Sequence, residues 1–140
     1  MQTFLEFKMD IPKAKDTLGI PRDKMPQIAS SDYDKFIGYL EKNGVKMTKR
    51  NIAAGILRPI QKEFSKVGVE ASMIKGLSGK IPKPLIASSD NYIIDGHHRW
   101  LATKNLDPKD KMVVLQANVK MNELLPLTLG FSDVTFKGIY

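Results

Sequence analysis

The sequence predicts a single domain of the α+β class, a small mixed sheet with flanking helices. Helical and strand patterns alternate along the chain, but without the regular strand–helix–strand series of a parallel α/β sheet. Two apolar runs, 84–88 and 92–94, flank Ser89-Asp90-Asn91, and turn-forming residues between such runs predict a β-hairpin. With 140 residues, 42% of them hydrophobic, the chain is long enough for one core.

The N-terminal half contains one clear amphipathic helix. Phe36, Ile37 and Leu40 recur at helical spacing after Ser30-Ser31-Asp32, and Asn43-Gly44 ends the pattern. Weaker patterns predict a strand over 3–9, a short helix between 12 and 20, an extended stretch over 25–28, a strand over 45–50, and strand or turn over 51–57.

The C-terminal half is expected to hold several helices and the longest strand, without internal repeats. The expected elements are a helical turn over 60–64 behind Pro59, a helix over 69–77, the hairpin of 84–94, a helix over 97–105 that Asp107-Pro108 ends, a strand over 112–119, and a helix over 122–129 despite Pro126.

Composition limits the classes of function. The net charge of +7 favours anionic partners such as nucleic acid or nucleotides, although spread lysines equally fit a soluble domain. The absence of cysteine excludes disulfides, thiolate catalysis and Cys-ligated zinc. The sequence shows neither a signal-peptide pattern nor a run long enough to span a membrane. We therefore expect a cytoplasmic protein without a membrane partner, and the sequence leaves its oligomeric state open.

Most of the chemistry is concentrated in Asp95-Gly96-His97-His98-Arg99, where an apolar strand ends and a helix begins. A helix start points backbone N–H groups at an anion, and Gly96 allows the close approach of backbone to ligand. The planar fork of Arg99 suits phosphate oxygens. His98 can donate to a phosphate or transfer a proton, and Asp95 can hold Mg²⁺.

Structural interpretations of the same residues compete with these. Neighbouring helical residues diverge by about 100°, so His97 and His98 cannot both face one site. A histidine at a helix start and an Arg99 paired with a surface acid would need no ligand. A zinc site would need histidines at i and i+4 and a third ligand, which the pattern does not supply. Trp100 is expected in the core rather than as a base-stacking platform.

The hairpin followed by a Gly-x-x-Arg turn resembles the ParB/sulfiredoxin superfamily, in which this turn binds nucleotide phosphates. Residues 57–63, Leu-Arg-Pro-Ile-Gln-Lys-Glu, resemble the segment before the superfamily's first core helix, which would be 69–77. With Met-Pro-Gln-Ile at 25–28, the chain is similar to short phage proteins labelled ParB-like nucleases and to the free-serine kinases of this fold. The resemblance is best over 57–119 and implies a single domain, 1–140, with a core of about 52–130 and an N-terminal extension, 1–51.

Departures from the superfamily remove two of its activities. Sulfiredoxins place a catalytic cysteine directly after the glycine, where this chain has His97, so sulfinic acid reduction is excluded. Partition proteins carry Glu-Arg-Arg after the glycine and two further domains downstream. Because few residues follow Arg99 here, a partition clamp is not expected.

The resemblance implies ATP, CTP or ADP as ligand, with Mg²⁺. The residues it implies are Gly96, His97, His98, Arg99, Ser88 and Lys83 for the nucleotide, His98, Glu63 and Asp95 for catalysis, Asp95 and Glu63 for the metal, and Gln61 and Gln27 for the substrate. The first function implied is nucleotide-dependent phosphotransfer or hydrolysis. The second is a ParB-like nuclease or accessory protein that binds DNA, and the third is a nucleotide sensor without turnover. A phage origin would place the protein in the host cytoplasm.

Overall fold

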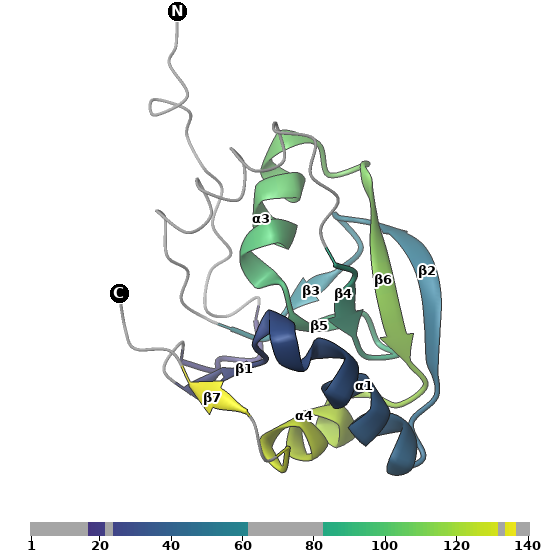
Figure 1. The fold of residues 1–140 in the computed structure, drawn as a ribbon. Coiled ribbons are helices and arrows are strands. Elements are labelled where there is room, and N and C mark those ends of the chain that lie inside the picture. The colour runs from purple at the N-terminus through teal and green to yellow at the C-terminus, as the bar shows by residue number, and fades with distance from the viewer. Residues whose placement is uncertain (1–16, 22–23, 62–82, 132–133, 137–140) are drawn as a thin grey trace, which may run out of the picture.

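A five-stranded mixed sheet forms the centre of the protein (Figure 1). The computed structural model describes residues 17–21, 24–61, 83–131 and 134–136. Within them, three helices accompany the sheet. The elements are β1 (Pro26–Gln27), a 3₁₀ turn (Ser30–Asp32), α1 (Tyr33–Lys42), β2 (Met47–Ala53), β3 (Arg58–Pro59), β4 (Leu85–Ala87), β5 (Tyr92–Asp95), α3 (His97–Leu106), β6 (Lys111–Ala117), α4 (Met121–Leu129) and β7 (Thr135–Phe136).

The strand order in the sheet is β2-β6-β4-β5-β3. The pairs β2–β6 and β4–β5 are antiparallel, whereas β6–β4 and β5–β3 are parallel. β1 and β7 form a separate two-stranded antiparallel sheet. The domain is therefore a small mixed α/β domain, as the irregular order of elements in the sequence predicts.

The first core lies between the sheet and the helices α1 and α4. Phe36 and Leu40 of α1 and Leu124 of α4 pack with Ile86 and Ile94 from the sheet, and all five side chains are buried. Phe36 recurs with Leu40 at a spacing of four, so one face of α1 carries the apolar contacts.

The second core lies on the opposite face of the same sheet, under α3. Trp100 and Leu101 of α3 pack against Leu85, Ile93 and Val114. Leu85 belongs to this core and its neighbour Ile86 to the first, because successive strand residues point to opposite faces. The indole Nε1 of Trp100 donates a hydrogen bond of 2.7 Å to the Ala54 carbonyl. The prediction that Trp100 is a core residue is confirmed.

Most of the predicted elements that fall within the described residues are present. The hairpin forms as β4 and β5. The helix expected between Ser30-Ser31-Asp32 and Asn43-Gly44 forms as α1, and those expected over 97–105 and 122–129 form as α3 and α4. The long C-terminal strand forms as β6. Pro126 lies inside α4 without ending it. The extended stretch over 25–28 contains β1.

Two predictions are corrected. The helical turn expected behind Pro59 is wrong at its start: Arg58–Pro59 is strand β3, and Gln61 forms an isolated parallel bridge with Ile20. Proline is tolerated here because β3 is an edge strand of the sheet. The core also begins before residue 52, since α1 and β2 both belong to it. The strand expected over 3–9, most of the helix between 12 and 20, and the helix over 69–77 lie outside the described residues.

Candidate functional site

Gly96 joins β5 directly to α3, and its backbone conformation is one that only glycine adopts easily. Its φ is +98°, in the left-handed region that side chains disfavour. A Cβ at this position would lie 2.1 Å from Leu85 Cδ2 and 3.1 Å from Arg99 Nη2. The N-cap residue of α3 is Gly96 itself, which has no side chain with which to cap the helix. The backbone N–H groups of the first turn of α3 are therefore the donors that a helix start offers to an anion.

Arg99 lies within the first turn of α3, and its guanidinium reaches back over Gly96. Its Nη1 donates a hydrogen bond to the carbonyl of Lys83, just before β4. Burial lowers the pKa of Arg99, and the neighbouring Asp95 and Tyr33 oppose that shift. Because arginine is effectively always protonated in proteins, the turn carries a fixed positive charge.

Asp95 is the last residue of β5 and lies half-buried beside this guanidinium. Burial raises the pKa of its carboxyl above the ordinary value, and Arg99 opposes the rise. A carboxylate whose pKa is raised at a turn is a candidate proton acceptor, although structural ion pairs perturb pKa values too.

Tyr33 completes the group and is a residue that the sequence analysis missed. It is the first residue of α1, and its hydroxyl donates a 3.1 Å hydrogen bond to the carbonyl of Pro84. Burial and the charge of Asp95 raise its pKa to about 12, so the phenol is neutral. Lys83 Nζ lies 4.9 Å from the centroid of its ring. We call Tyr33, Lys83, Asp95 and Arg99 the motif cluster.

The two adjacent histidines have different surroundings. His97 is buried, and its Nε2 accepts a 3.1 Å hydrogen bond from the backbone N–H of Ile60. Burial, with a smaller effect of His98, lowers the pKa of His97 to about 3, so the ring is neutral. This geometry gives His97 a structural role, that of fixing the start of α3 to the segment after β3. His98 is half-buried, and as its neighbour on the helix it points in a different direction.

The other predicted site residues do not join the motif cluster in the described structure. Ser88 is fully buried in the β4–β5 turn, where its hydroxyl donates to Asp90 and accepts a 3.1 Å hydrogen bond from the N–H of Tyr92. The length of β5, on the order of 10 Å, separates that turn from Gly96. Ser88 is thus a turn residue.

Gln61 and Gln27 occupy backbone-paired positions. Gln61 is buried in its bridge with Ile20, and Gln27 lies in β1 opposite Thr135. Glu63 lies outside the described residues. Among the described residues, no group of three or more histidine, aspartate or glutamate side chains is placed to hold a metal ion.

The comparisons with known proteins give no relative: no protein-family model, no curated protein and no solved structure matches the chain. Within the part of the chain that the structure describes, no helix has both the length and the apolar character to cross a bilayer. The interpretation of the site therefore depends on its own geometry.

Proposed function

We propose that this domain binds the phosphates of a nucleotide at residues 96–99 and transfers or hydrolyses the terminal phosphoryl group. The fold would then be of the ParB/sulfiredoxin type that the motif resembles. One observation carries the proposal: the guanidinium of Arg99 lies within 3.1 Å of the place where a Cβ of Gly96 would stand. A planar cationic fork and a helix start thus meet at one residue without a side chain, and together they favour a phosphate group.

Each group of the site would have its own role in binding the nucleotide or in catalysis. The N–H groups of the first turn of α3 would bind phosphate oxygens, and Arg99 would neutralise their charge. The hydrogen bond from Nη1 to the Lys83 carbonyl fixes the plane of the guanidinium, so little of its mobility remains to be lost on binding. Lys83 adds an exposed positive charge beside the turn, and His98 is the candidate proton donor.

Asp95 is the described carboxylate nearest the turn, and it fits a Mg²⁺ site only in part. Protein-bound Mg²⁺ commonly uses one or two carboxylates and completes its shell with substrate phosphates and waters. Asp95 would be the single protein ligand among the described residues, and the ion would supply charge neutralisation on the phosphates. Without the ion, the same carboxylate can accept the proton of an attacking hydroxyl or water.

A nucleotide panel tests the binding. ATP, ADP or CTP with Mg²⁺ should raise the melting temperature, because ligand at 100 times its Kd adds about 2.7 kcal/mol to the stability of the folded state. In a domain of this size that is roughly 5–10 °C. Arg99→Ala should lose most of the shift, whereas Arg58→Ala, which removes an exposed arginine on β3, should retain it.

The absence of a shift with every nucleotide, or an equal shift in Arg99→Ala, would contradict the proposal. A phosphate-release and phosphotransfer assay on each nucleotide that binds then separates the two remaining functions. Product formation identifies an enzyme, and tight binding without product identifies a sensor.

A further inference from the structure

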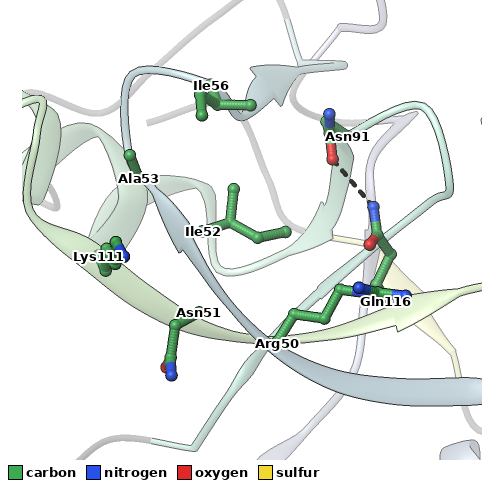
Figure 2. Close-up of a pocket in the computed structure, with 8 residues that line it drawn as sticks. All are labelled: Arg50, Asn51, Ile52, Ala53, Ile56, Asn91, Lys111 and Gln116. Carbon is green, nitrogen blue, oxygen red and sulfur yellow. Dashed lines mark hydrogen bonds between the residues drawn. The ribbon is translucent and has the colours of Figure 1, made fainter.

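We propose that a second site, an open hollow beside the edge strand β2, binds a single strand of nucleic acid. The hollow has a volume of about 650 Å³, within the roughly 300–1,000 Å³ of typical ligand sites. Its lining comes from β2, from β6 and from two turns, and six of its residues carry the argument: Arg50, Ile52, Ile56, Asn91, Lys111 and Gln116 (Figure 2). It shares no lining residue with the motif cluster, so this inference does not depend on the proposed nucleotide site.

The charges of the hollow favour an anion. Arg50 on β2 and Lys111 at the start of β6 are both exposed. Among the described residues that line the hollow, none is acidic. Figure 2 shows Ile52 near the centre, with the two cations at different points of the rim. Lys111 pairs with Ala53, three residues along β2 from Arg50, so the two cations are about 10 Å apart along the strand. They can contact two phosphates of one strand, which is how proteins hold a nucleic-acid backbone.

An oriented pair of amides provides hydrogen-bonding groups for bases. Gln116 Nε2 donates to Asn91 Oδ1 at 2.9 Å and to the Ser88 carbonyl at 3.1 Å. Asn91 has a φ of +67°, a conformation that asparagine tolerates in turns. Among the described residues, nothing bonds to Gln116 Oε1 or to Asn91 Nδ2. A fixed acceptor and donor beside each other suit the edge of a base, which carries both kinds of group.

The shape of the hollow favours a single strand over other polyanions. The amides lie in a recess with Ile52 and Ile56, and Ile56 is 57% exposed. An unpaired base can place its Watson–Crick edge and its apolar face in a recess, whereas a duplex keeps the face inside its stack and the Watson–Crick edge in a base pair. An acidic peptide would use the cations but not the exposed isoleucine.

Protection of an edge strand is the competing explanation for part of this surface. Lysine and arginine on an edge strand prevent sheets from pairing with one another, and β2 is one of the two edge strands of this sheet. That purpose accounts for Arg50. It does not account for an exposed isoleucine, or for an amide pair that joins Gln116 of β6 to Asn91 in its left-handed turn conformation.

Fluorescence anisotropy with a labelled mixed-sequence 15-nucleotide single strand tests the proposal. The variant Arg50→Ala/Lys111→Ala should bind on the order of tenfold more weakly. The slope of log K against log salt should fall by about 1.4, since each lost phosphate contact contributes about 0.7 for a single strand. Lys24→Ala/Lys42→Ala is the matched control: it removes the same charge from exposed positions outside the hollow and should change binding less than threefold.

The variant Gln116→Leu tests the contribution of the amide pair separately from that of charge. It should weaken binding of the single strand while leaving the salt slope unchanged. Equal losses in the two double variants, or competition by polyglutamate as strong as by unlabelled strand, would overturn the proposal in favour of general charge attraction. Displacement of the strand by saturating ATP would place both ligands in one site and would also overturn it. Retention of the strand under ATP that raises the melting temperature supports two separate sites. If ATP leaves the melting temperature unchanged, the proposed nucleotide site fails, while the comparison of the two double variants still tests the hollow.

Discussion

At the scale of single residues, the adjacent histidines show how burial separates two identical side chains. His97 receives a backbone hydrogen bond in the core, while His98 stays half-buried on α3. An accepting Nε2 places the ring proton on Nδ1. Protonation of Nε2 would break the bond and leave the Ile60 N–H without its acceptor in a buried place, which costs free energy.

His97 should therefore make the fold sensitive to acid. Its pKa is about 3 in the fold and near 6.5 in an unfolded chain, so the unfolded state binds more protons between these values. The contribution to stability is full above about pH 6.5 and is lost as the pH falls toward 3. Between pH 7 and pH 4 the loss is roughly 3 kcal/mol. Urea unfolding of the wild type and of His97→Gln, whose side chain does not titrate, measures it as the difference between their pH profiles.

Asp95 changes the pH dependence of stability in the direction opposite to His97. The effect of His97 is therefore measured as the difference between the wild-type and His97→Gln profiles. Its raised pKa means that its contribution to stability is present at low pH and lost as the pH rises through the folded value. If His97→Gln unfolds, NMR titration of the wild-type ring gives the answer directly. Protonation of His97 above pH 5 would contradict the prediction.

At the scale of elements, Gly96 decides how β5 passes into α3. Two costs of a side chain can be separated there, because Gly44 also has a positive φ, +83°, but nothing within 4 Å of an added Cβ. Gly44→Ala should cost only the strain of the backbone, about 1 kcal/mol. Gly96→Ala should cost more, about 2–4 kcal/mol, since it adds a clash with the buried Leu85 to the same strain.

Chemical denaturation of the two glycine variants measures this difference. Gly96→Ala should also lose the nucleotide-dependent rise in melting temperature, because the displaced Leu85 and Arg99 side chains disturb the turn. Equal destabilisation by both variants would show that no close approach exists at Gly96.

The sequence indicated elements most reliably where an apolar stripe or a turn was local. The helix α1 follows from the spacing of Phe36 and Leu40, and the hairpin follows from the turn between two apolar runs. The edge strand β2 gave a weak signal because most of its side chains are exposed, so apolar and polar residues do not alternate. The start of the helical turn expected over 60–64 was misassigned because Gln61 pairs with Ile20, a residue distant in the sequence.

At the scale of the whole molecule, the candidate site was predictable only in its contiguous part. Asp95, Gly96 and Arg99 are neighbours in sequence, so one motif contains them. Tyr33 reaches the motif cluster from α1 through packing against the hairpin. The hollow combines residues from β2, the β4–β5 turn and β6. No local pattern contains such a set, since it exists only once the sheet is formed.

The two cores share one sheet, and this predicts a single cooperative unfolding transition. Strand β4 places Leu85 in one core and Ile86 in the other, so neither core can open without strands that the other needs. Leu124→Ala, in the first core and fully buried, should cost about 2–5 kcal/mol. Trp100 is the single tryptophan and belongs to the second core. Its fluorescence should therefore show the same loss of stability, although the substitution lies in the first core.

Urea titrations followed by Trp100 fluorescence and by far-UV circular dichroism should therefore give coincident midpoints, both lowered in Leu124→Ala. Leu129→Ala on the same helix is the control: its side chain is 44% exposed, and its removal should shift the midpoint little. A Trp100 transition that stays at the wild-type midpoint in Leu124→Ala would show that the faces of the sheet unfold independently. Because the motif cluster lies at the junction of β5, α1 and α3, that result would also mean that the nucleotide site can open while the second core stays folded.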